Sequence, residues 1–117
     1  MVQAQSKIID VPLSQTTVLY LRYGNSIARC FWLRNFSPQN EITIKFQELV
    51  AGNWTDIDDQ IVLGVPGSGT EQSTKLITST NPLRLLASGG TNDRDLEVAV
   101  AQMFDDSQTT AWASPLT

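Results

Sequence analysis

The most chemically suggestive residues of this 117-residue chain are three clustered carboxylates, Asp56, Asp58 and Asp59. Calcium is bound by roughly six to eight oxygen atoms, and this run lacks the glycine and the terminal glutamate of a calcium-binding loop. We therefore expect a solvated acidic turn here rather than a metal site. Glu41 and Glu48 lie on opposite faces of one predicted strand, so these two carboxylates cannot act together across a bond.

Two further features suggest chemistry but lack essential parts. Residues 64–70, GVPGSGT, place two glycines five positions apart, as a phosphate-binding loop does, but the lysine of such a loop is missing and no helical pattern follows. The chain has no histidine, the commonest general base and metal ligand. Its single cysteine, Cys30, is expected to be a small hydrophobic residue within a strand. We predict a protein that is not an enzyme and binds no cofactor or metal.

Charge and hydropathy limit the possible partners. The formal net charge of −4 argues against nucleic acid, because a surface that follows phosphates is basic. The apolar runs are far shorter than a membrane span, and the first ten residues lack the apolar core of a signal peptide. The length suits one domain. We therefore expect a single domain that contacts neither nucleic acid nor membrane.

The elements that must position any site are strands. In residues 41–49, EITIKFQEL, the apolar side chains of Ile42, Ile44 and Phe46 recur with a period of two, which predicts a strand with one buried face. Residues 29–36 read as the preceding strand, and the segment 37–40, SPQN, reads as a turn. A second turn leads into residues 54–57. The centre of the chain is thus predicted to be a β-meander.

The remaining pattern predicts an all-β fold. Short apolar stretches separated by glycine, proline and asparagine amount to about eight strands, which is typical of an antiparallel β-sandwich, either jelly-roll or immunoglobulin-like. The sandwich is assigned to residues 1–104, with residues 1–6 as a short flexible start, and residues 105–117 are predicted to form an extended arm. The other predicted strands cover residues 7–13, 16–23, 60–65, 75–78, 83–88 and 96–104.

Aromatic residues supply the candidate contacts. The strand at residues 28–36 carries apolar side chains on both faces, so we expect the opposing sheet on one side and a neighbouring subunit or loop, over Cys30 and Trp32, on the other. For the Trp32 side chain itself we favour core packing, with stacking on a sugar ring as the alternative, and Trp54 is expected to fold back with Ile57 onto the sheet edge. Trp112 lies in the polar arm and has no such place, so we expect it to contact another chain, with docking on its own domain as the alternative.

Residues 33–57, LRNFSPQNEITIKFQELVAGNWTDI, resemble part of the small all-β decoration (cement) proteins of bacteriophage capsids. The resemblance implies a structural virion protein, made in the host cytoplasm and located on the capsid surface. It also implies a homo-oligomer, usually a homotrimer, that clamps neighbouring subunits of the major capsid protein. The alternative is a carbohydrate-binding module of a phage fibre or spike, which would require Trp54, either alone or together with Trp32, exposed on one concave surface. The candidate partner-binding residues are Trp112, Leu116, Cys30, Trp32 and Trp54.

Overall fold

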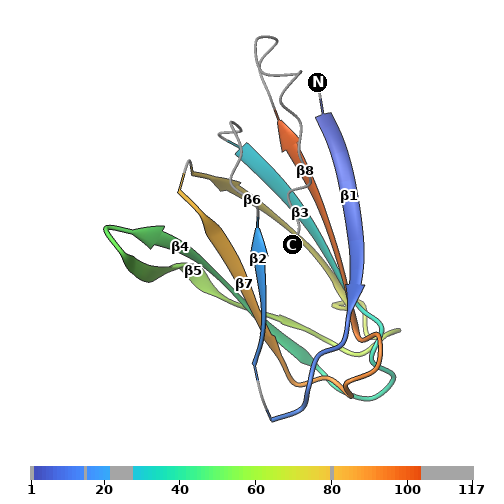
Figure 1. Cartoon of the computed structure of the whole chain (residues 1–117). Coiled ribbons are helices and arrows are strands. Elements are labelled where there is room, and N and C mark those ends of the chain that lie inside the picture. The colour runs from blue at the N-terminus through green and yellow to red at the C-terminus, as the bar shows by residue number, and fades with distance from the viewer. Residues whose placement is uncertain (1, 15, 22–27, 80, 104–117) are drawn as a thin grey trace.

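The computed structural model describes residues 2–14, 16–21, 28–79 and 81–103 of the chain. These residues form two facing sheets of strands (Figure 1), so the all-β prediction is confirmed. No helix that could cross a membrane occurs among them. The strands are β1 (Val2–Ile9), β2 (Thr17–Leu21), β3 (Ala28–Asn35), β4 (Ile42–Val50), β5 (Asn53–Leu63), β6 (Gln72–Thr78), β7 (Leu83–Ser88) and β8 (Leu96–Met103).

The strand pairs are nested along the chain. One sheet has the order β1-β8-β3-β6 and the other has the order β2-β7-β4-β5. The first strand therefore pairs with the last, the second with the seventh, the third with the sixth and the fourth with the fifth, always antiparallel. This is the arrangement of one long hairpin folded into two sheets, which is a jelly roll. The sandwich prediction is confirmed, and the strand order selects the jelly roll over the immunoglobulin-like alternative.

Alternation along β4 builds the core as predicted. Ile42 and Ile44 have no exposed surface and Phe46 is almost completely buried, whereas the residues between them are only half-buried. Phe46 meets Phe31 of β3 across the interior, with ring centroids 4.8 Å apart, so these two rings join the two sheets. The rest of the core comes mainly from β7 and β8: Leu83, Leu85, Ala87, Leu96, Val98 and Val100.

The predicted β-meander is wrong, because β3 and β4 belong to different sheets. The side chain of Asn35, which is fully buried at the end of β3, explains the crossing. Its Nδ2 donates to the carbonyl oxygens of Asn40 and Gly64, each at 2.8 Å, and its Oδ1 accepts from the backbone N–H of Ser37 at 2.7 Å. The segment after β3 is therefore tied to the end of β5 and leads into the second sheet. We call Asn35 and these three hydrogen-bond partners, Ser37, Asn40 and Gly64, the Asn35 cluster.

The start of the chain also differs from expectation. Residues 1–6 were predicted to be a flexible start, but β1 begins at Val2 and pairs with β8 along its whole length, from Val2–Met103 to Ile9–Leu96. The local sequence VQAQS has no strong strand pattern. Pairing with the central strand β8 supplies backbone hydrogen bonds that the local pattern does not reveal.

β5 is one long strand where two short ones were predicted, at residues 54–57 and 60–65. The register shows the reason: Ile57 lies opposite Phe46 and Ile61 lies opposite Ile44, so three β5 residues face the single β4 residue between them. This bulge adds two residues and therefore preserves the alternation of faces. Asp58, inside the bulge, has a φ of 56° and forms an ion pair with Lys75 of β6, which links the two sheets along this side.

A buried carboxylate fastens the loops at one end of the sandwich. Asp95 accepts hydrogen bonds from the backbone N–H groups of Val11, Thr91 and Asp93 at 2.8–2.9 Å, and from the hydroxyl of Thr91. Burial raises the pKa of Asp95, but the hydrogen bonds together lower this pKa by a larger amount, so the net shift is downward. The segment after β1 is thus held to the β7–β8 loop by an ionised group.

Candidate interaction surface

β3 has one buried face and one exposed face. Phe31 and Leu33 point into the core and are buried, while Cys30 is half-buried and Trp32 is 42% exposed. The predicted division of this strand into two apolar faces is therefore correct, but the core packing favoured for Trp32 is wrong. Whether another subunit covers the outer face stays a prediction.

The flanking strands extend this outer face. Trp32 lies opposite Thr74 of β6 and Ala99 of β8, while Cys30 lies opposite Leu76, which is 61% exposed. Because Leu76 is a diagonal neighbour of Trp32, the two apolar side chains are within reach of each other. We call the surface formed by these outward-pointing side chains the Trp32 face: Cys30, Trp32, Arg34, Gln72, Thr74, Leu76, Glu97 and Ala99.

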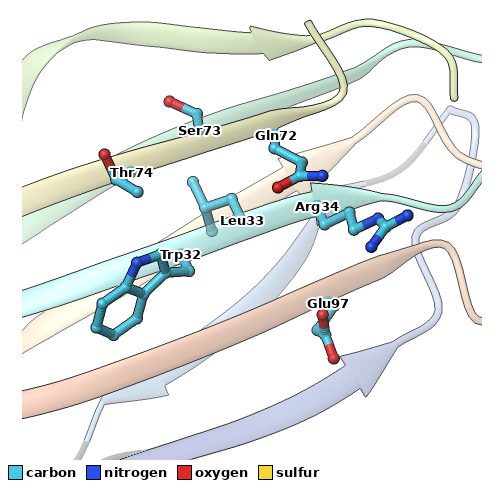
Figure 2. Close-up of a pocket in the computed structure, with 7 residues that line it drawn as sticks. All are labelled: Trp32, Leu33, Arg34, Gln72, Ser73, Thr74 and Glu97. Atoms are coloured by element: carbon cyan, nitrogen blue, oxygen red, sulfur yellow. The ribbon is translucent and has the colours of Figure 1, made fainter. Parts of the chain in front are cut away.

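A shallow hollow of about 340 Å³ lies in the Trp32 face. Figure 2 shows the indole of Trp32 at one end, with Arg34 and Glu97 at the other. Gln72 and Thr74 of β6 form one side. The guanidinium of Arg34 also sits 4.8 Å from the centroid of the Phe36 ring, which supports it. The hollow therefore combines an aromatic wall with hydrogen-bond donors and acceptors.

The charge on the Trp32 face is balanced although the chain is acidic. Among the described strand residues that point outward from this sheet, Glu97 is the acidic one, and it lies directly opposite Arg34 in the β3–β8 register. The clustered carboxylates Asp56, Asp58 and Asp59 are on β5, in the other sheet. A second acidic body could therefore approach the Trp32 face with less repulsion than elsewhere.

One region of the outer face of the other sheet consists of polar side chains that bond to one another. Arg84 of β7 lies 4.4 Å from the centroid of the Trp54 ring and donates from Nε to Oε1 of Gln47 at 2.7 Å. Gln47 in turn donates to Asp56 at 2.7 Å, and Lys45 forms an ion pair with Asp56 at 3.2 Å. The hydrogen bonds from Gln47 and Lys45 lower the pKa of Asp56. These side chains are held by one another.

The two described tryptophans do not share a surface. Trp54 is half-buried on the edge strand β5, with its outer face covered by Arg84, whereas Ile57 points the other way and packs against the core. Trp32 points outward from the opposite sheet. The form of the carbohydrate-binding alternative that uses both tryptophans on one concave surface is therefore excluded. The role of Trp54 in partner binding stays a prediction.

The other sequence motifs have ordinary surroundings. In the loop that begins at Gly64, the backbone N–H of Gly67 donates to the carboxylate of Glu71 at 2.7 Å, and this bond lowers the pKa of Glu71. The N–H group of Gly67 is therefore already bonded to the carboxylate of Glu71, which follows in the same loop. Across the described part of the chain, no three His, Cys, Asp or Glu side chains are grouped so as to hold a metal ion. Trp112 and Leu116 lie outside the described residues.

Sequence reasoning missed Leu76, the most exposed apolar residue of the Trp32 face. A signal was present, because Leu76 and Ile77 are adjacent in a strand and adjacent strand residues point to opposite faces. Since Ile77 is buried, Leu76 has to point outward. The same reasoning was applied to β3 but not to β6.

Comparison with known proteins places the chain by fold. No protein-family model matches the sequence, and no curated protein matches it. Among solved structures, the chain is similar to one from Bacillus endospore appendages, described as a novel family of disulfide-linked pili, with a TM-score of 0.51, 14% identity and coverage of 89% of each chain. The chain is therefore an all-β protein that shares its fold with a pilus protein of low sequence identity.

Two other similar structures have lower scores. The mitogen derived from Yersinia pseudotuberculosis has a TM-score of 0.49 at 12% identity, with 100% of this chain and 94% of that chain covered. The empty virus-like particle of cowpea mosaic virus has a TM-score of 0.46 at 8% identity, with 91% of this chain and 81% of that chain covered.

Proposed function

We propose that this chain is a structural protein of a virion surface, a capsid decoration protein whose copies associate with one another through the Trp32 face. The observation that carries the proposal is the pair of exposed apolar side chains, Trp32 of the inner strand β3 and Leu76 of the edge strand β6, on a charge-balanced sheet face. The jelly-roll fold and the resemblance of residues 33–57 to phage decoration proteins support a structural role.

The energetics favour contact at this face. Trp32 is 42% exposed, so covering the rest of this large side chain removes on the order of 100 Å² of surface from water. At about 25 cal/mol per Å², this burial contributes about 2.5 kcal/mol before the costs of association are subtracted. Arg34 and Glu97 lie opposite each other at one end of the hollow and balance each other's charge, so another acidic copy can approach this face with less repulsion. Such a face suits binding to copies of itself.

The remaining parts of the proposal concern the shell. The oligomer, expected to be a trimer, would sit on the capsid and clamp neighbouring subunits of the major capsid protein. Residues 105–117, with Trp112 and Leu116, would extend the contact surface beyond the sandwich. The N-terminal segment has no part in this reach, because β1 begins at Val2.

The test compares two variants by light scattering. We expect the wild-type chain to have the molar mass of an oligomer at micromolar concentration, and the double variant Trp32→Ser/Leu76→Ser to have the mass of one chain. Val62→Ser is the matched control, because Val62 is 45% exposed but belongs to β5 in the other sheet. Circular dichroism would verify that all three chains fold. A wild-type chain that stays monomeric, or a double variant with unchanged mass, would refute association through this face.

Attachment to the shell needs its own measurement. Cosedimentation with empty shells assembled from the major capsid protein should be lost in the Trp32→Ser/Leu76→Ser variant if the oligomer is the form that binds. Equal cosedimentation of the variant and the wild-type chain would show that shell binding does not depend on the Trp32 face.

A further inference from the structure

We infer that the hollow beside Trp32 receives residues 105–117 from a second copy of the chain, with Trp112 as the inserted group. This inference rests on the proposed self-association and names the segment that occupies the face. Nothing among the described residues covers the exposed side of Trp32 or Leu76, whereas the chain continues for fourteen residues beyond Met103.

The last described strand, β8, ends near the hollow. β8 ends at Met103, opposite Ala28, while Ala99 lies opposite Trp32 on the same pair of strands. Four residues of strand correspond to about 13 Å, whereas the nine residues from Met103 to Trp112 can span roughly 30 Å when extended. The segment after Met103 is therefore long enough to pass from its own β8 to the hollow of an adjacent copy.

The sequence of this segment suits the hollow. Trp112 is flanked by Ala111 and Ala113, whose small side chains let the backbone approach a flat sheet surface. An inserted indole could stack on the Trp32 ring, and aromatic pairs contribute about 0.5–1.5 kcal/mol beyond area burial. A volume of about 340 Å³ is at the lower end of the roughly 300–1,000 Å³ that ligand-binding pockets have.

The polar lining favours an extended segment over a second sheet. Flat packing of two Trp32 faces would bury Arg34, Glu97 and Gln72 between them, and each polar group would then need a new partner. An extended segment covers the apolar centre, leaves Arg34 and Glu97 open to water at the rim, and offers backbone groups to Gln72 and Thr74. This arrangement covers the indole without the cost of desolvating charged groups.

A second copy, rather than the same chain, follows from the proposed association. A segment folded back on its own Trp32 face would cover the apolar surface through which the copies are proposed to associate. Exchange of the same segment covers every Trp32 face and links the copies at once, as in domain swapping. The acidic sandwich domains of the two copies then do not have to pack directly against each other.

Cysteine crosslinking of the full-length chain tests the inference. Cys30 lies on the Trp32 face and is the chain's one cysteine. One variant carries Cys30→Ser and Ala113→Cys, and it is mixed with the wild-type chain, which retains Cys30. After mild oxidation, mass spectrometry of the digested dimer should find position 113 linked to Cys30, which in this mixture can arise only between copies. Adding Trp112→Ala to the first variant should reduce this product about 30-fold, the equivalent of about 2 kcal/mol.

A second mixture provides the control. Replacing the wild-type chain by a Cys30→Ser/Val62→Cys variant places the thiol on the other sheet, and little product is expected. A chain that carries both Cys30 and Ala113→Cys and forms the link only within itself would overturn the exchange. Absence of the link in chains that still associate would overturn the inference but leave the proposed function standing. A monomeric wild-type chain would overturn both.

Discussion

Asn35→Ala should be among the most destabilising substitutions in the chain, although Asn35 touches no candidate partner-binding residue. The variant removes the partners of the Ser37 N–H and of the Asn40 and Gly64 carbonyl oxygens. Leaving a buried polar group without a partner costs about 1–3 kcal/mol, and because such losses do not add fully, we expect a total of about 3 kcal/mol. For a domain of this size, this lowers Tm by about 12 °C.

Asn35→Asp provides the sharper measurement. The introduced carboxylate would face the carbonyl oxygens of Asn40 and Gly64, so its pKa in the folded chain should lie above its unfolded value. The variant is then destabilised most at neutral pH, and part of the loss is recovered as pH falls and the introduced group is protonated. Urea unfolding at pH 7 and pH 4 measures both effects, with Asn53→Ala, at an exposed position, as the control. A loss in Asn35→Ala no greater than in Asn53→Ala would refute the role of the Asn35 cluster.

Two further predictions concern the loops at the end of the sandwich. Because hydrogen bonds lower the folded-state pKa of Asp95, its stabilisation is present above the unfolded pKa of about 3.9 and is lost as pH falls. Asp95→Asn should therefore be less stable than wild type at pH 7, with the difference shrinking below about pH 4 in thermal melts, and a pH-independent difference would contradict this origin. Gly89→Ala should destabilise by about 2 kcal/mol more than Gly67→Ala, because both have positive φ but a Cβ at Gly89 would lie 2.6 Å from the carbonyl oxygen of Glu41. Equal urea midpoints for the two glycine variants would exclude that contact.

Local alternation explains why much of the fold could be predicted from sequence. The side-chain period of two fixes which residues share a face, and the buried set Ile42, Ile44 and Phe46 follows from that period alone. The same rule separates Phe31 from Trp32. Both predictions concern neighbours within one strand, where no information from distant parts of the chain is needed.

Pairing between strands could not be predicted in the same way, because it is decided by distant contacts. The turn at residues 37–40 has the composition of a hairpin turn, yet Asn35 connects it to Gly64, twenty-nine positions away, and the chain crosses to the other sheet. β1 has a weak local pattern and is ordered by pairing with β8 at the far end of the chain. Exposed Leu76 lies within the predicted strand 75–78, and alternation with the buried Ile77 was enough to place it on the outer face.

The jelly-roll topology places β8, the strand that precedes the proposed donor segment, in the same sheet as the receiving hollow. β8 lies between β1 and β3 because the last strand pairs with the first, so the described chain ends on an inner strand of the sheet that carries Trp32. Each copy can then give one segment and receive one. If two copies exchange their segments with each other, the assembly closes as a dimer. If each copy gives its segment to the next copy, the assembly closes as a ring, such as the expected trimer. A closed ring leaves no Trp32 face uncovered, so the oligomer should stop at a fixed size. A molar mass that keeps rising with concentration would indicate open-ended assembly and would contradict closure.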